Sequence, residues 1–369
     1  MYETIRDGDH IETIVIGGGQ CGLAVGYDLG QRGREYVILD AGERVGDVWR
    51  KRWDSLLMFT PARYNALPGM EFPAKADTFV GKDAMADYLE SYALANDLPI
   101  KLGVRVEHVS HDGERYVVET NRMTLYSDNV VVAMAEFQVP KVPAFAGDLD
   151  PTIAQLHSTK YQNPDQLQPG PVLVVGLGNS GADIGLEVAR THETYIAGKE
   201  SAHIPFRIEP WFGRNVLVRL VRFMMINVIT TSTPIGRRVL RKNGAGKAAP
   251  LVRVKPKDLA AVAERVGRVA GVRDGRPVLD DGRRLDVANV IWCTGFERGF
   301  PWIDLDVFDE NGRPRHERGV VTDQPGLYFC GLDFLHSLWS ETVIGEVTDA
   351  RYVVKNLSAN RPPVRRATV

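Results

Sequence analysis

One pattern occurs twice in this chain and constrains its fold more than any other feature. Residues 12–41 and 171–199 each contain a β-rich apolar run, a G-x-G-x-x-G turn, an apolar-periodic segment and a second apolar run. Each stretch predicts a strand, a tight turn, a helix and a second strand, as in a dinucleotide-binding βαβ unit. Two such units predict an α/β fold with two Rossmann-like dinucleotide-binding domains.

The rest of the chain fits the same organisation. Residues 82–95 predict a helix, and residues 116–120 and 129–132 predict strands. The proline-rich segment 140–145 predicts a crossing between domains, because proline cannot sit in a central strand. We expect further strands ending near Ile291 and within 326–335, a closing helix over 340–357, and a loose tail after it.

These elements predict that the first domain is discontinuous. It comprises residues 1–145 and 296–369, and the second domain comprises residues 146–295. Within the second domain, residues 203–251 have the least regular pattern and are the candidate for a lid and for substrate contacts.

Composition excludes several other classes of protein. The net charge is -2, which suggests no general attraction to nucleic acid. The N-terminal residues lack the pattern of a signal peptide, and no apolar run is long enough to cross a membrane, so we expect a cytoplasmic protein. Three widely spaced cysteines fit a reducing compartment, and the eight histidines show no metal-binding motif.

The first glycine turn carries its own chemistry. Gly17 permits the turn, Gly19 lets a pyrophosphate approach the backbone, and Gly22 lets the helix pack closely on the strand. The phosphates would then lie at a helix N-terminus. Asp40 ends the second strand, where a carboxylate can bind ribose hydroxyls, and Cys21 is expected to be a small buried filler. The predicted contacts to this nucleotide are Gly17, Gly19, Gln20, Cys21, Gly22, Asp40 and Ala41.

In the second turn the glycines have the same roles, but the strand that follows ends in a different residue. The predicted contacts of this turn are Gly176, Gly178, Asn179, Ser180, Gly181 and Lys199. Lys199 stands where Asp40 stands in the first unit, and a cation there suits a 2′-phosphate, which favours NADPH. Glu200 is adjacent, so NADH stays open as an alternative donor.

Several motifs together resemble the class B flavoprotein monooxygenases, in particular their flavin-containing and YUCCA-like branch. They are the two glycine turns, the stretch from Glu43 to Trp49, Phe145-x-Gly147 followed by His157-Ser158-x-x-Tyr161, and Cys293-Thr294-Gly295-Phe296. The related disulfide reductases need a CxxC or CxxxxC pair, and no two cysteines of this chain are close in sequence. Two departures from the family pattern stand out: Ala133-Met134-Ala135 in place of Ala-Thr-Gly, and Gly331-Leu332-Asp333 in place of Gly-Asp.

The resemblance implies FAD in the first domain and NADPH in the second. It implies a monooxygenase that inserts one oxygen atom of O2 into a small organic substrate through a C4a-hydroperoxyflavin, by N-, S- or keto-acid oxygenation. It also implies flavin-site roles for Val48, Trp49, Thr294, Gly295, Asp333 and Thr342, and it makes His157 a candidate for coupling the two domains. The helix near Ser340 would direct its N-terminus at the flavin, with Ser340 and Thr342 in contact. Glu341 is there too, and an acid beside a reduced flavin would be unfavourable unless it points away.

Alternatives remain open at this level. A Baeyer–Villiger oxygenase, an NAD(P)H-dependent flavin reductase and a non-catalytic FAD/NADP-binding module all fit the two loops, and a homodimer is one option for assembly. Residues 214–242 either pack over the active site with solvated arginines or dock on a membrane surface. The cations in question are Arg219, Arg222, Arg237, Arg238, Arg241 and Lys242.

Overall fold

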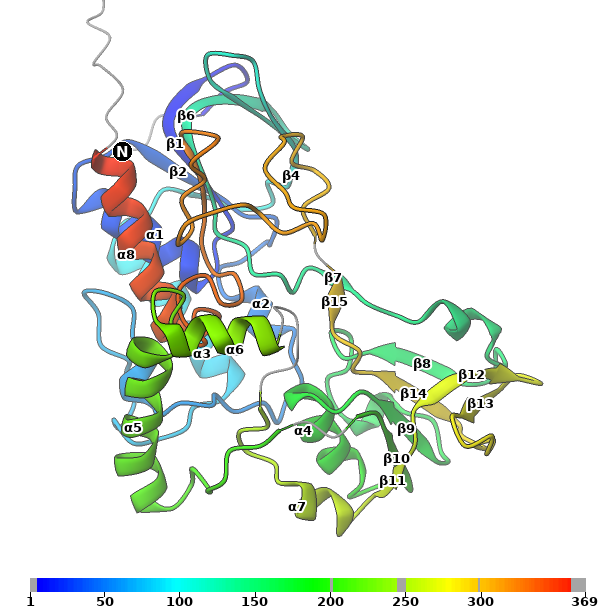
Figure 1. The fold of residues 1–369 in the computed structure, drawn as a ribbon. Helices are drawn as coiled ribbons and strands as arrows, with labels where there is room; N and C mark the ends of the chain where they lie inside the picture. The colour runs from blue at the N-terminus through cyan, green and yellow to red at the C-terminus, as the bar shows by residue number, and fades with distance from the viewer. Residues whose placement is uncertain (1–4, 200–201, 244–249, 298, 360–369) are drawn as a thin grey trace, which may run out of the picture.

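The first glycine loop belongs to a seven-stranded sheet in the upper part of Figure 1. The computed structural model describes residues 5–199, 202–243, 250–297 and 299–359. The strand order of this sheet is β3-β2-β1-β6-β5-β4, and β16 also pairs with β6. The strands are β1 His10–Ile16, β2 Tyr36–Leu39, β3 Ile100–Lys101, β4 Val106–His111, β5 Tyr116–Thr120, β6 Thr124–Val132 and β16 Leu327–Phe329.

Parallel pairing at the centre of this sheet places the nucleotide loop. β1 pairs in parallel with β2 and with β6, and β16 joins β6 in parallel, whereas β4, β5 and β6 pair antiparallel. The buried strands β1 and β2 end next to each other, so the turns that follow them meet at one edge. Helices α1 Gln20–Gly30, α3 Lys82–Ala95 and α8 Val343–Ala359 share one hydrophobic core with this sheet.

The second glycine loop belongs to a separate five-stranded sheet, in the lower part of Figure 1. Its order is β11-β10-β9-β14-β8 and all its pairs are parallel. The strands are β8 Ala154–His157, β9 Val172–Val175, β10 Thr194–Ala197, β11 Glu264–Val266 and β14 Asn289–Trp292. Helices α4 Asn179–Val188 and α7 Pro256–Ala260 pack on it, and β12 Val269–Arg273 with β13 Arg276–Leu279 forms a hairpin beside it.

The two crossings of the chain pair with each other. β7 Val139–Pro140 and β15 Phe296–Glu297 form an antiparallel two-stranded ribbon that lies between the two sheets (Figure 1). Pro140 thus lies in an edge ribbon, where the missing N–H costs no central ladder bond. The domain boundaries at residues 145 and 296 stay a prediction.

The two ends of the candidate lid, residues 203–251, lie next to each other beside the second sheet. His203 and Leu251 form a parallel bridge, and the backbone N–H of Ile204 donates to the carbonyl of Leu251 at 3.0 Å. Between them, α5 Val218–Phe223 is flanked by the π-helical segments Gly213–Leu217 and Met224–Val228, and α6 Pro234–Asn243 follows. Figure 1 shows α5 at the outer edge of the molecule.

Most predicted elements are present, with shifted ends. The helix over 82–95 and the strand over 116–120 have the predicted bounds, while β6 begins at Thr124, five residues before the predicted strand. The strand within 326–335 is only three residues long, and the closing helix begins at Val343 rather than at Ser340. The remaining short helices are α2 Asp47–Arg50 and the 3₁₀ turns Ala62–Tyr64, Ala144–Asp148 and Pro164–Gln166.

In the described part of the chain, none of the helices has the length and apolar character that crossing a bilayer requires.

Candidate functional site

The first loop has the geometry that a bound pyrophosphate needs. Gly17 has a φ of +106°, and a Cβ there would lie 2.9 Å from the carbonyl oxygen of Ala133. A Cβ on Gly22 would collide with the carbonyl oxygen of Gly17, so α1 can approach β1 only through glycine. Gly19, by contrast, precedes α1 and faces open space. The loop therefore leaves room at the N-terminus of α1, where an anion is favoured.

Asp40 fixes the shape of this loop. Its carboxylate accepts hydrogen bonds from the backbone N–H of Gly18 at 2.6 Å and of Gly42 at 2.7 Å. Each oxygen keeps a lone pair for a ribose hydroxyl, so the predicted role fits the geometry. Of the other predicted contacts, Ala41 and Val48 are exposed beside the loop.

Gln20 and Trp49 are joined to the closing helix. The indole N–H of Trp49 donates to Oε1 of Gln20 at 3.2 Å, and Nε2 of Gln20 donates to Oε1 of Glu346 at 3.3 Å. Glu346 is buried, and burial raises its pKa well above the usual value. Glu346 lies 326 residues beyond Gln20 in sequence, so no local motif indicates this contact.

The N-terminus of α8 differs from the prediction in one respect. Thr342 precedes the helix, and its hydroxyl donates to the carbonyl of Trp339 at 2.7 Å. Ser340, predicted to contact the flavin, is fully buried, and its hydroxyl accepts from the backbone N–H groups of His336 and Ser337. Ser340 therefore stabilises the turn before the helix instead. The reason is that the helix begins three residues later than predicted.

Glu341 lies near two other acidic side chains. Burial raises its pKa to about 7, and the nearby carboxylates of Asp333 and Glu136 act in the same direction. Asp333 itself lines a cavity of about 710 Å³ together with residues of α6, including Arg237 and Leu240. An acid with this pKa is partly neutral at pH 7, which reduces its repulsion of a negative charge nearby.

Two cysteines that are distant in sequence, Cys21 and Cys330, lie next to each other behind the first loop. The side chains of Cys21 and Cys330 are hydrogen-bonded to each other, because α1 packs against the turn that follows β16. Both are free thiols, and burial raises the pKa of both. Thiols of this kind are poor nucleophiles. The prediction that Cys21 is a buried filler fits this environment.

The departure at Ala133-Met134-Ala135 causes no backbone strain. Four non-glycine residues of the described chain have positive φ, namely Asp97, Asp274, Arg318 and Phe334, and Ala135 is not one of them. The glycine usual at this turn in the resembled family is therefore not required for this backbone.

The second loop repeats the geometry of the first. Gly176 has a φ of +107°, and a Cβ on Gly181 would collide with the carbonyl oxygen of Gly176. Gly178 precedes α4. Asn179 is fixed by the end of the candidate lid: its side chain donates to the carbonyl of Pro250 at 3.2 Å and accepts from the N–H of Val252 at 3.0 Å. Ser180 is half-buried in the first turn of α4.

A second cation lies beside Lys199, and the sequence patterns missed it. Lys199 is exposed just after β10, next to Gly198. Arg265 on the neighbouring strand β11 donates to the carbonyl of Gly198 at 3.0 Å. Two cations at this strand end would suit a 2′-phosphate better than one. The missed signal is the parallel pairing of β11 with β10, which no spacing in the sequence reveals.

His157 lies where the second sheet meets the ribbon. Its Nε2 is 3.1 Å from the carbonyl oxygen of Gly295, and its ring packs edge-on against Phe296. The N–H of Thr159 donates to Nδ1, so the proton is on Nε2 and donates to Gly295. Burial lowers the pKa of His157, which keeps the ring neutral. Thr294 donates to the carbonyl of Lys141 in the other crossing. These contacts support the predicted coupling role.

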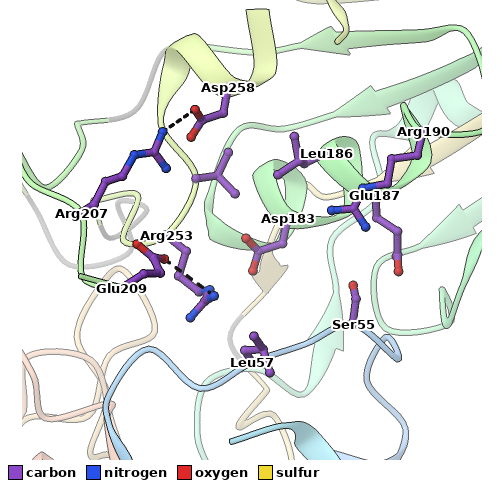
Figure 2. Close-up of a pocket in the computed structure, with 11 residues that line it drawn as sticks. Ser55, Leu57, Asp183, Leu186, Glu187, Arg190, Arg207, Glu209, Arg253 and Asp258 are labelled. Atoms are coloured by element: carbon purple, nitrogen blue, oxygen red, sulfur yellow. Dashed lines mark hydrogen bonds and ion pairs between the residues drawn. The ribbon is translucent and has the colours of Figure 1, made fainter. Parts of the chain in front are cut away.

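A pocket of about 350 Å³ opens between α4 and the candidate lid (Figure 2). One face of α4 lines it through Asp183, Leu186 and Glu187, and Arg190 lines it from the turn after α4. Arg253 pairs with Glu209 at 3.7 Å and Arg207 with Asp258 at 2.6 Å, and Ser55 and Leu57 complete the wall from the first domain. Burial raises the pKa of Asp183 to about 6. Arg207 and Glu209 belong to residues 203–251, the segment predicted to provide substrate contacts, and the other lining residues are not among the sequence-predicted contacts.

Comparison with known proteins agrees with this geometry. Residues 14–232 match the family model described as pyridine nucleotide-disulphide oxidoreductase. The chain is 35% identical to a CzcO-like oxidoreductase of Geobacillus kaustophilus, over 94% of this chain and 98% of the relative. It is 26% identical to the indole-3-pyruvate monooxygenase YUCCA4 of Oryza sativa, over 86% and 82%. The solved flavin-containing monooxygenase of Stenotrophomonas maltophilia is 27% identical, with a TM-score of 0.75 over 95% of this chain and 99% of that one.

Two glycine loops, each at the end of parallel strands, define an oxidoreductase that uses FAD and a nicotinamide nucleotide. The chain belongs to the pyridine nucleotide-disulphide oxidoreductase family. Within it, the relatives place the chain with the class B flavoprotein monooxygenases, as the sequence motifs predict.

Substitutions at the first loop separate packing from cofactor binding. Gly22→Ala should destabilise the protein by about 1–3 kcal/mol through the clash with Gly17. Gly19→Ala should leave the apoprotein stable but weaken FAD binding at least about tenfold, since its Cβ would enter the phosphate space. Thermal melting and FAD titration measure the two effects, with the exposed Gly147→Ala as control. Unchanged FAD affinity in Gly19→Ala would contradict the assignment.

The buried acid in the pocket predicts a pH-dependent stability. Because the pKa of Asp183 is about 6 in the folded protein and 3.8 as its ordinary value, the folded state holds this proton more tightly. Its contribution to stability is therefore lost as the pH rises through this window. Asp183→Asn should raise stability at pH 8 by about 1–3 kcal/mol and change it little at pH 4. Thermal unfolding against pH measures this, with the exposed Asp148→Asn as control. A gain independent of pH would contradict the prediction.

Proposed function

We propose that this protein is an FAD- and NADPH-dependent monooxygenase that inserts one atom of O2 into a small organic substrate. The substrate class is a nucleophilic nitrogen or sulfur compound, or an α-keto acid undergoing oxidative decarboxylation. FAD would occupy the first domain, residues 1–145 and 296–369, and NADPH the second, residues 146–295. This proposal combines the two loops with the similarity to flavin monooxygenases.

The observation that carries the proposal over a disulfide reductase is the state of the cysteines. The pair Cys21 and Cys330 is buried behind the FAD loop, and its thiols have raised pKa values. The third cysteine, Cys293, is also a buried free thiol, and burial raises its pKa to about 12. A dithiol that exchanges electrons with an external disulfide needs an accessible thiolate. These thiols offer none, so O2 is the better acceptor.

The chain's own residues supply binding and orientation. The N–H groups at the start of α1 would bind the FAD pyrophosphate and Asp40 its ribose, while the start of α4 and Lys199 would bind NADPH. The N-terminus of α8, preceded by Thr342, would stabilise negative charge on the flavin. FAD accepts a hydride from NADPH and activates O2 when it is bound. His157 would link the domain that holds NADPH to the ribbon.

Oxygen labelling tests the proposal. The yellow holoprotein, reduced anaerobically by NADPH and then exposed to isotopically labelled O2 with an amine, a thioether or an α-keto acid, should yield labelled product. Peroxide alone with every substrate would contradict it. Ester formation from a ketone would indicate a Baeyer–Villiger enzyme instead, and oxidation only by a quinone a reductase. No bleaching by NADPH would indicate a non-catalytic binding module.

The NADPH assignment predicts a change in donor preference. Lys199→Ala should lower the ratio of kcat/KM for NADPH over NADH by about tenfold, which corresponds to about 1.4 kcal/mol. Arg265→Ala should act in the same direction, because both cations lie at one strand end. The exposed Lys160→Ala serves as control. An unchanged ratio in Lys199→Ala would overturn the 2′-phosphate role.

A further inference from the structure

On the helix that contains α5, large apolar side chains are exposed to solvent, and several polar side chains contact the rest of the protein. Along residues 211–228 the exposed positions follow helical spacing, and most are large and apolar: Trp211, Phe212, Val216, Leu220, Phe223 and Met224, here called the apolar ridge. Trp211 is 66% exposed, Leu220 56% and Phe223 57%. Single exposed apolar residues are ordinary, but a continuous row of large ones marks an interaction surface.

Several polar side chains of the same helix face the protein, whereas Arg219 and Asn227 are exposed. Arg214 forms an ion pair with Asp77 at 3.5 Å, and Asn215 accepts from Arg63 at 2.8 Å. Arg222 lies over the ring of Tyr64 at 5.2 Å, so it is not a solvated arginine, as the packing alternative expected. The inward contacts of these residues are therefore made by charge and hydrogen bonding, and Val218 is the buried apolar residue of α5. The ridge is exposed, and α5 lies at the outer edge of the molecule (Figure 1).

The sequence segment that contains the ridge has charges of a single sign. Residues 210–257 contain eleven Lys and Arg and no Asp or Glu, whereas the other 321 residues carry 34 cations and 47 anions, a net charge of -13. Arg219 on the helix itself, and Arg237, Arg238 and Arg241 on α6, are exposed. The apolar ridge is thus carried by the strongly cationic part of an otherwise acidic protein.

We propose that the apolar ridge docks this protein on the surface of an anionic lipid bilayer. Trp, Phe, Leu and Met side chains of the ridge would enter the boundary of the acyl chains, and the arginines would contact anionic headgroups. A second copy of the chain fits poorly, because pairing two ridges would bring two cationic segments together. The acidic remainder of the molecule keeps any other face from binding such a surface.

Vesicle flotation of the full-length holoprotein tests this. Vesicles of phosphatidylcholine with phosphatidylglycerol should bind at least about tenfold more protein than phosphatidylcholine alone, and salt should reduce the difference. The double variant Leu220→Glu with Phe223→Glu should lose this binding about tenfold or more. Leu94→Glu, which replaces a residue 76% exposed on α3, should not. FAD absorbance and melting temperature confirm that each variant is folded.

The other outcomes overturn the proposal. Absence of binding to the anionic vesicles would do so, as would equal binding by the double variant. A dimer in solution that the double variant abolishes, without vesicle binding, would assign the ridge to a second copy. Binding that depends on charge but not on the ridge, seen as equal loss in Leu94→Glu and in the double variant, would also contradict it.

Discussion

The contact between a glycine and a backbone carbonyl governs both halves of this molecule. In each sheet, the helix after the loop approaches so closely that Gly22 or Gly181 has the preceding loop carbonyl where a Cβ would be. The approach brings free N–H groups to the edge of the sheet and orients the helix dipole at one point. The positions of Asp40, of Lys199 and of the closing helix depend on these two approaches.

Local features of the site could be predicted from the sequence. The spacing of the glycines determines the geometry of a turn of six residues, and the position of Asp40 follows from the length of one βαβ unit. Both features could therefore be predicted from the sequence. The start of the closing helix was missed by three residues, because Ser340 and Thr342 are both plausible first residues and only their hydrogen bonds separate them.

Contacts between distant segments could not be predicted. Cys21 meets Cys330 because α1 packs against the turn after β16, and Gln20 meets Glu346 because α8 packs on α1; each pair is more than 300 residues apart in sequence. Arg265 reaches the second loop through strand pairing, and Asp183 gains its raised pKa from burial under the lid. A single sequence contains spacing but not the packing that decides these neighbours. The exposure of large apolar side chains on the helix that contains α5 is of the same kind, since its periodicity alone does not say which face is covered.

The ribbon of β7 and β15 has a mechanical consequence. Two independent linkers would let the two domains tilt, slide and twist relative to each other. Here the outgoing and returning strands are hydrogen-bonded to each other, and the carbonyl of Gly295 is held by His157. A rotation of one domain relative to the other must therefore bend both strands together, about a single axis. Such a hinge would limit the paths along which a nicotinamide ring bound to one domain can approach a flavin bound to the other.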